Sequence, residues 1–308
     1  MTWDTDVADY LRLRRQLGAQ LHWPEHLLHQ FAAHLTAAGI EAITVTEAIS
    51  WCSLLPAGAT VAPATRRMEA VRGFATYMHA LDPAHHVPPP GIFRALVHRH
   101  TLYIYSQAEI TAVIHAATML AGGTRAQTYP VLFSLLAATG LRVGEALGLD
   151  RATVDLDAGV LLISRGKGRD PRLVPLHPTA AAALERYAHW RADLHHDRGS
   201  AFFTDPNGER LKYATVRENW VQASTAAGVH TAAQHPRMHD LRHAFAVNTL
   251  LGWYRDDADV AAKMPALTTY LGHSNPANTY WYLSAVPELL AFAAARLDSA
   301  TTRVPVES

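Results

Sequence analysis

Four short segments of the chain carry side chains that bind anions, move protons or act as nucleophiles. They contain Arg142, Lys167, the run His239-Asp240-Leu241-Arg242-His243, and His273 with Tyr282 nine positions later. On a helix, His239, Arg242 and His243 are three and four positions apart, so they share one face. That face would carry two imidazoles beside a permanent cation, which suits anion binding and proton transfer.

Taken singly, each of these residues also has an ordinary structural explanation. Arg142 can pair with a nearby carboxylate such as Glu145, and Lys167 can be a solvated turn residue. His243 is a candidate for a histidine that is hydrogen-bonded in the core, and residues 280–282 can be an aromatic packing cluster. Only the four segments together, in this order, point to an active site.

The surrounding elements place these residues at helix starts and on a hairpin. Thr139-Gly140 ends a predicted helix, so Arg142 lies at a helix junction. Strand-like runs at 160–163 and 172–174 flank a glycine-rich stretch, which puts Lys167 at a hairpin tip. After Pro178 the chain returns to helices, predicted over residues 213–227, 239–252, 260–271 and 287–298.

The chain has 308 residues, which is enough for two domains. Residues 1–82 predict short helices, one of which starts at the capping sequence Thr44-Val45-Thr46-Glu47. Prolines 83 and 88–90 cannot continue a helix. The predicted domains are therefore an N-terminal helical domain (1–82), a Pro-rich linker (83–100) and a larger domain (101–308) that opens with the capping box Ser106-Gln107-Ala108-Glu109.

The composition is that of a globular protein, with 49% hydrophobic and 18% charged residues. No apolar run reaches the roughly 18 residues needed to cross a bilayer, so we expect a cytoplasmic protein without a membrane partner. Cys52 is the single cysteine, which excludes an internal disulfide and a zinc site built from cysteines.

Total charge gives no sign of an anionic partner, because 27 basic residues balance 27 acidic ones. Local charge does. Nearly all of the positive charge is guanidinium, the group that binds phosphate through two parallel hydrogen bonds. The stretch around the predicted hairpin tip has four basic residues and a single acidic one, Asp170. The basic residues are Arg165, Lys167, Arg169 and Arg172.

Read in order, these segments resemble the tyrosine recombinase family, the phage-integrase and Xer-type DNA breaking-and-joining enzymes. The resemblance covers most of residues 106–298. It is carried by Ala138-Thr139-Gly140-Leu141-Arg142-Val143-Gly144-Glu145-Ala146-Leu147, by Gly166-Lys167-Gly168 followed by Leu173-Val174-Pro175-Leu176, by His239-Asp240-Leu241-Arg242-His243, and by Leu271-Gly272-His273-Ser274 with Tyr282. Two features depart from the common pattern. The segment from Trp253 to Met264 is longer, and Tyr280 is a second, minor candidate for the nucleophile.

The resemblance implies a mainly α fold with a small antiparallel β-sheet (α+β). It implies a SAM-like helical core-DNA-binding domain followed by a catalytic domain. The implied activity is site-specific recombination through a 3′-phosphotyrosyl intermediate, with Tyr282 as nucleophile. The implied catalytic residues are Arg142, Lys167, His239, Arg242, His273 and Tyr282. The residues expected to contact DNA are Arg165, Arg169, Arg172 and His243.

The resemblance also implies the partners. They are double-stranded DNA with an inverted-repeat recombination site and a homo-tetramer assembled on it, alone or with related recombinases. No cofactor, metal or ATP is expected. The Pro287 region and the long segment before Leu271-Gly272-His273 are similar to recombinases carried by mobile elements. The helix from Pro287 to Leu297 could dock on a neighbouring subunit or pack in its own core, and the sequence leaves both open.

Three alternatives remain at this stage. An accessory protein of the same fold would bind DNA without cutting it, and a topoisomerase-like enzyme would share the cleavage chemistry. A zinc metalloprotease is suggested by the four-residue spacing of His239 and His243. However, Arg242 would then face a dication, and Asp240 is too short for the usual glutamate base, so this is the weakest alternative.

Overall fold

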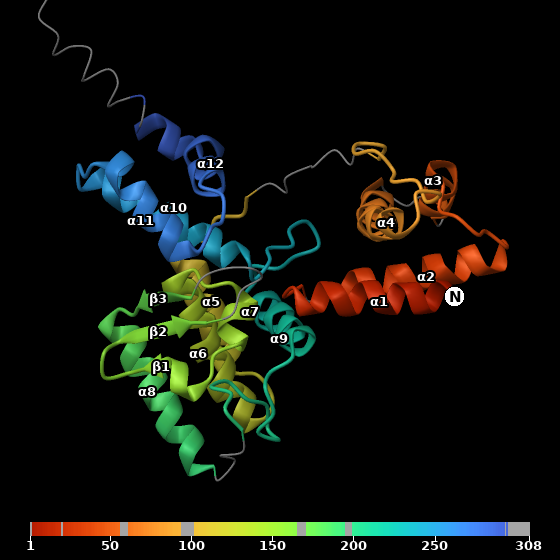
Figure 1. The fold of residues 1–308 in the computed structure, drawn as a ribbon. Coiled ribbons are helices and arrows are strands. Elements are labelled where there is room, and N and C mark those ends of the chain that lie inside the picture. The colour runs from red at the N-terminus through yellow and green to blue at the C-terminus, as the bar shows by residue number, and fades with distance from the viewer. Residues whose placement is uncertain are drawn as a thin grey trace, which may run out of the picture. The chain divides into compact units, whose positions relative to one another are not determined.

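The computed structural model describes residues 2–19, 21–55, 61–93, 102–164, 171–194, 199–292 and 294. The chain divides into two compact units, Met1–His100 and Thr101–Ser308 (Figure 1). None of the helices in the described part is both long and apolar enough to span a bilayer.

Within its described residues, the first unit is helical. Its helices are α1 (Trp3–Gln16), α2 (His22–Ala37), α3 (Val45–Ser53) and α4 (Val61–Leu81). Helices α1 and α2 lie side by side, and α4 packs against both of them and against α3. Phe31 and Phe74 are fully buried in the shared core. The predicted start of α3 is confirmed, because the Thr44 side chain accepts the Glu47 backbone N–H at 3.1 Å.

Residues 83–93 pack with the first unit instead of leaving it. Arg72 in α4 donates from Nε to the Pro88 carbonyl (2.9 Å) and from Nη2 to the Pro89 carbonyl (3.0 Å). His85 is buried and accepts the Ile43 backbone N–H on Nδ1 at 3.1 Å. The linker predicted over residues 83–100 thus begins with a segment that packs on the first unit, and residues 94–100 of it lie outside the described residues.

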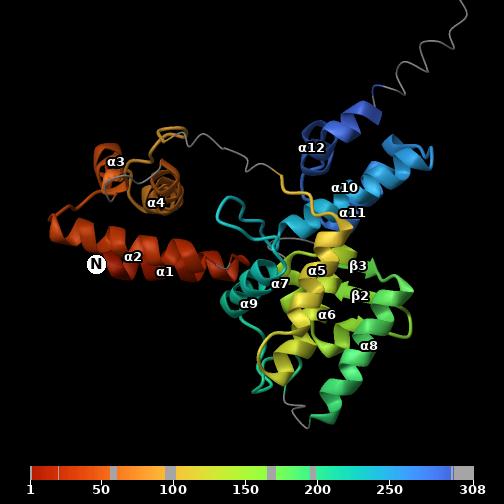
Figure 2. The ribbon, with the colours of Figure 1, turned by 180° about the vertical axis from the view of Figure 1, so that it is seen from behind.

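The second unit is also mainly helical. Its helices are α5 (Gln107–Thr118), α6 (Gly123–Thr139), α7 (Val143–Leu147), α8 (Pro178–Asp193), α9 (Tyr213–Ala226), α10 (Asp240–Arg255), α11 (Val260–Leu271) and α12 (Ala277–Ala285). Helix α5 packs against α6 and α9, and α6 also contacts α8 and α10. Figures 1 and 2 show the strands and α8 on one side of α6 and α9 on the other. Phe133 and Trp220 meet edge-to-face across this core, 4.9 Å between ring centroids.

Three short strands form an antiparallel sheet in the order β1 (Val154–Asp155), β2 (Val160–Ile163) and β3 (Arg172–Pro175). A 3₁₀ turn, η1 (Arg151–Thr153), precedes β1. Leu161 pairs with Val174, and both are fully buried against the helices. Helix α11 contacts β3, which brings the C-terminal end of α11 to the sheet. The predicted fold class, mainly α with a small antiparallel sheet, is confirmed.

Local signals located most helix starts correctly. Ser106 and Glu109 form the predicted capping box, with both reciprocal hydrogen bonds present. Helix α5 ends at Thr118, before the Gly122-Gly123 pair. Residues 287–292 are helical, and Leu289 in this segment is fully buried in the core formed with α10 to α12. The sequence left two alternatives for this helix, docking on a neighbouring subunit or packing in its own core. The structure shows the second.

Candidate active site

Arg142 takes its position from the junction between α6 and α7. Gly140 ends α6 with φ of +60°, and Arg142 then adopts an extended conformation immediately before α7. A Cβ atom at position 140 would lie 2.6 Å from Cδ1 of Phe245. Both the left-handed backbone and the close approach of α10 therefore require glycine here.

The two predicted phosphate-binding arginines meet at the end of α11. Arg142 donates from Nη2 to the Gly272 carbonyl at 2.9 Å and from Nη1 to the Leu271 carbonyl at 3.4 Å. Arg242 donates from Nη2 to the same Leu271 carbonyl at 2.6 Å and from Nη1 to the Gly140 carbonyl at 2.8 Å. Residues more than 100 positions apart in the sequence are thus joined through main-chain acceptors.

Arg242 is deeply buried, with 2% of its surface exposed. Burial, and then the positive charge of Arg142, lower the pKa of Arg242 to about 10. The group still carries its charge at neutral pH. Two guanidiniums held this close repel each other, so an anion placed between them would be stabilised by both.

Glu145 supplies the carboxylate that pairs with two of the arginines, Arg142 and Arg172. It accepts Nη1 of Arg142 at 2.7 Å, and it pairs with Arg172 through Nη1 (3.1 Å) and Nη2 (2.8 Å). Burial raises the pKa of Glu145, but the hydrogen bonds from Arg172 and Arg142 outweigh it and lower the pKa to about 2. The sequence predicted the pairing of Glu145 with Arg142, three positions away, but not its pairing with Arg172, 27 positions away.

Arg172 was predicted to contact DNA, but its side chain points inward. Besides the bidentate pair with Glu145, its Nε donates to the Tyr270 carbonyl at 2.9 Å. Only 11% of the side chain is exposed. A Cβ atom at Gly272 would lie 2.8 Å from Cζ of Arg172, so the glycine lets the guanidinium pass. In this arrangement Arg172 links β3 to α11 and has little surface left for a phosphate.

His239, the N-cap residue of α10, and His243, in its first turn, lie side by side as the spacing predicted, with ring centroids 4.9 Å apart. Burial, and then the charge of Arg242, hold the pKa of His239 below its usual range. Burial, and then the neighbouring His239, lower the pKa of His243 to about 4. Both imidazoles are therefore neutral at pH 7, and each offers one acceptor nitrogen.

Tyr282 is buried, with 2% exposed, and its hydroxyl lies 2.8 Å from Nδ1 of His243. Burial raises the pKa of Tyr282, while the charges of Arg242 and Arg142 lower it. The contact with His243, which is next to Arg242 in α10, places the phenol in the same cluster. His243 was predicted to contact DNA, yet in this structure its Nδ1 holds the tyrosine. Tyr280, the minor candidate, is 48% exposed.

His273 follows directly after Gly272, whose carbonyl binds Arg142. Its Nδ1 lies 2.7 Å from the Thr279 hydroxyl. Sequence reasoning missed Thr279, because a threonine in a helix gives no chemical signal. The predicted catalytic residue Lys167 and the predicted DNA contacts Arg165 and Arg169 lie outside the described residues. The strands that flank them, β2 and β3, pair as expected of a hairpin.

The cluster does not resemble a metal centre. Within the described residues, no group of three or more His, Cys, Asp or Glu side chains is arranged to hold a metal ion. The metalloprotease alternative therefore has no ligand set in that part of the chain, since the Nδ1 atom of His243 faces Tyr282.

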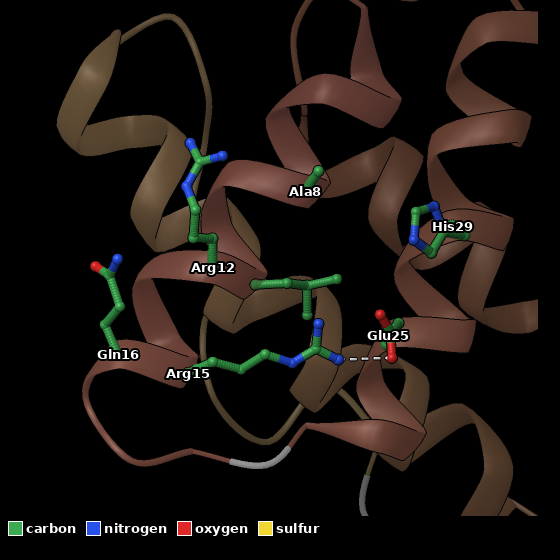
Figure 3. Close-up of a pocket in the computed structure, with 7 residues that line it drawn as sticks. Ala8, Arg12, Arg15, Gln16, Glu25 and His29 are labelled. Atoms are coloured by element: carbon green, nitrogen blue, oxygen red, sulfur yellow. Dashed lines mark hydrogen bonds and ion pairs between the residues drawn. The ribbon is translucent and has the colours of Figure 1, made fainter.

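The first unit has a hollow of about 460 Å³ between α1 and α2 (Figure 3). Arg15 and Glu25 form an ion pair across it at 2.7 Å, and Arg12 and His29 are also paired with acidic side chains. Because both arginines are matched by carboxylates, the hollow carries no chemistry comparable to that of the second unit.

The buried histidine makes a testable prediction about stability. The pKa of His243 is 6.5 when unperturbed and about 4 in the folded protein, so between these values the unfolded chain binds more protons. The free energy of unfolding should therefore fall by up to about 3 kcal/mol as pH decreases through this range. Urea unfolding at neutral pH and near pH 4.5 measures the fall.

His243→Gln should reduce this fall, whereas His115→Gln, at an exposed position on α5, should leave it unchanged. An unchanged fall in His243→Gln would mean that His243 is not buried in its neutral form. Glu145 does not confuse the comparison, because its lowered pKa affects stability only below about pH 4.5.

Comparison with known proteins agrees with this geometry. Residues 105–288 match the phage integrase family. A putative integrase/recombinase, y4rB, of Sinorhizobium fredii is 38% identical over 301 residues, covering 95% of this chain and 96% of that protein. The tyrosine recombinase XerD of Mycobacterium tuberculosis is 33% identical over 233 residues, covering 71% of this chain and 68% of that protein.

Solved structures share the fold. The Tn1549 transposon integrase in complex with transposon right end DNA superimposes with a TM-score of 0.65 at 16% identity, covering 97% of this chain and 99% of that one. The XerA recombinase gives a TM-score of 0.51 at 22% identity and covers 98% and 99%. The cluster of arginines, histidines and a tyrosine thus lies in a chain that belongs to the phage integrase family of tyrosine recombinases.

Proposed function

We propose that the protein is a site-specific DNA recombinase that cuts and rejoins strands through a 3′-phosphotyrosyl intermediate on Tyr282. One observation carries the proposal: Arg142 and Arg242 meet at the Leu271 carbonyl, and the Tyr282 hydroxyl contacts His243, the residue that follows Arg242 in α10. Membership of the tyrosine recombinase family supports it.

In the proposed reaction, the two guanidiniums bind the non-bridging oxygens of the scissile phosphate and stabilise the charge of the pentacoordinate state. The Tyr282 oxygen forms a bond to phosphorus as the bond from phosphorus to the 5′ oxygen breaks. The phenol proton passes to an imidazole, and Lys167 gives a proton to the departing 5′ oxygen. His239 and His273 share the work of accepting the phenol proton and donating to the phosphate.

The resting protein does not contain an activated nucleophile. Burial keeps the pKa of Tyr282 above its usual value, and the imidazole that its hydroxyl contacts, that of His243, has a pKa of about 4. Proton transfer between them is therefore strongly uphill, and the hydrogen bond stabilises the neutral phenol. Activation of Tyr282 depends on DNA reaching the site.

The covalent intermediate keeps the energy of the phosphodiester bond. The 5′ hydroxyl of another strand can attack it and release the tyrosine, so neither ATP nor a metal ion takes part. The proposed substrate is double-stranded DNA with inverted repeats, bound by a tetramer of this chain. A mobile element is the proposed setting. The fold shared with the Tn1549 transposon integrase is in line with it.

Covalent capture tests this function directly. Duplexes that the protein binds are first selected from a random-sequence pool, and each is then nicked near the centre so that a short fragment is lost after cleavage. We expect a DNA–protein adduct that resists denaturant, forms in EDTA without ATP, and yields a phosphorylated peptide containing Tyr282 after digestion.

Selected duplexes that are bound but never attached would identify a DNA-binding accessory protein. Attachment through Tyr280 or a serine would overturn the assignment of the nucleophile. Binding should weaken steeply with added salt, because phosphate contacts release counterions.

A further inference from the structure

Arg237, which lies two residues before His239, is held by a turn of the same kind as the one that holds Arg142. In both turns an acidic residue donates its backbone N–H to the carbonyl of the arginine three positions earlier, at 2.9 Å. The acidic residues are Asp240 and Glu145. Each carboxylate accepts the backbone N–H of its arginine in return, at 2.7 Å for Asp240 and 3.0 Å for Glu145.

The same carboxylates also fix the side chains of the two arginines. Arg142 donates from Nη1 to Glu145 at 2.7 Å. Arg237 donates to Asp240 from Nη2 at 2.8 Å and from Nε at 3.4 Å. Both carboxylates are buried, whereas 26% of the Arg142 side chain and 47% of the Arg237 side chain are exposed. A guanidinium already held in one geometry loses little freedom when it binds an anion, so Arg237 is as well prepared for this as Arg142.

The outer side of the Arg237 guanidinium has hydrogen-bond donors that Asp240 does not use. A guanidinium has five N–H donors, and Asp240 accepts one from Nε and one from Nη2. Both N–H groups of Nη1 and one of Nη2 remain. Within the described part of the chain, no other acceptor forms a hydrogen bond with them. These coplanar donors match two oxygens of one phosphate.

Asp240 places this guanidinium beside the proposed nucleophile. Its Oδ1 atom lies 2.8 Å from Nη2 of Arg237 and 4.0 Å from Nε2 of His243. The other ring nitrogen of His243, Nδ1, lies 2.8 Å from the Tyr282 hydroxyl. One carboxylate therefore separates Arg237 from the imidazole that contacts the nucleophile.

We propose that Arg237 binds a second phosphate of the cleaved strand, next to the scissile one. Arg142 and Arg242 donate to carbonyls at the end of α11, whereas Arg237 is held just before α10, at another edge of the site. Consecutive phosphates of one strand are about 3.4 Å apart along the helix axis, so neighbouring phosphates can meet these two edges. Such a contact positions the strand without reading its bases. The role rests on the proposed function, because it requires DNA in the site.

Equilibrium binding to a selected duplex without a nick measures this contact. Arg237→Gln should weaken binding about tenfold and should reduce the slope of log affinity against log salt concentration by about 0.9, the value for one lost phosphate contact. Arg237→Lys keeps the charge, so its slope should equal that of the wild type. Arg186→Gln, at an exposed position on α8, should change neither affinity nor slope. An unchanged slope in Arg237→Gln would overturn the proposal.

Uncharged linkages in the DNA locate the phosphate. Methylphosphonates replace the phosphates of the cleaved strand one at a time, and the wild type should lose affinity at each phosphate that it contacts. Arg237→Gln should lose nothing further at one position only, because the two changes then remove the same contact. A variant that is merely destabilised would keep the wild-type pattern at every position. The same scan with Arg142→Gln marks the scissile phosphate, and the Arg237 position should be its neighbour.

A wild-type pattern in Arg237→Gln would contradict the proposal, and so would coupling of Arg237 to the scissile phosphate itself. A phosphate contact weakens binding to every sequence alike. Loss of preference for the selected duplex over an unrelated one would therefore indicate a base contact and would also count against the proposal. If the wild type binds the duplex but forms no adduct on its nicked form, the proposed function fails, while the methylphosphonate scan still decides the role of Arg237.

Discussion

Tyr282→Phe should abolish covalent attachment to the nicked duplex while leaving DNA binding close to wild type. The substitution removes one oxygen atom, and that atom is the proposed nucleophile. The ring remains to fill its place in the core with α10 and α11. The hydroxyl contacts His243, so a small loss of stability, on the order of 1 kcal/mol, is expected with it.

Tyr280→Phe is the matched control, because it removes the same atom two residues away from a ring that is 48% exposed. Its adduct yield should equal that of the wild type. Both variants are compared by denaturing gel after equal binding to the same duplex. A normal adduct yield in Tyr282→Phe would remove Tyr282 from the mechanism, and loss in Tyr280→Phe alone would transfer the role to Tyr280.

Arg142→Lys should lower the rate of adduct formation by about 10²–10³-fold, the usual cost of losing one preorganised donor to a developing charge. The Arg142 guanidinium already uses Nη1 and Nη2 for separate acceptors, Glu145 and the Gly272 carbonyl. An ammonium keeps the charge but cannot reproduce that fork. DNA affinity, which depends on many phosphates, should fall far less.

The measurement for Arg142→Lys is a single-turnover time course at saturating protein, so that a change in affinity does not alter the rate. Arg186→Lys, at an exposed position on α8, should behave as the wild type. Wild-type rates in Arg142→Lys would contradict its role in binding the phosphate.

Much of the fold could be predicted because its signals are local. The capping box at Ser106 and the glycine stop at Gly140 are written in neighbouring residues, and the structure contains both. The face shared by His239 and His243 follows from helical spacing alone. By contrast, residues 83–93 looked like a linker because of their prolines, yet those prolines offer carbonyls that Arg72 binds.

The partners of the site residues could not be predicted in the same way. The acceptor for Arg142 is 130 positions away, and it is a carbonyl, which every residue has. Arg172 stands beside other basic residues, which predicted a DNA contact, and nothing in the sequence signals that its guanidinium pairs with the buried carboxylate of Glu145, 27 positions away. The contact of Thr279 with His273 gave no signal, since it forms only where α12 packs against α11.

The main-chain carbonyls of Gly140, Leu271 and Gly272, which accept hydrogen bonds from Arg142 and Arg242, determine which substitutions the site can accept during evolution. Since a carbonyl survives any substitution, drift at Leu271 leaves both guanidiniums oriented as long as the new side chain fills the same space. The two glycines have no such latitude, because an added methyl group would collide with Phe245 or with Arg172. Substitutions at Leu271 should therefore be tolerated far more readily than alanine at Gly140, the end of α6, or at Gly272, the end of α11.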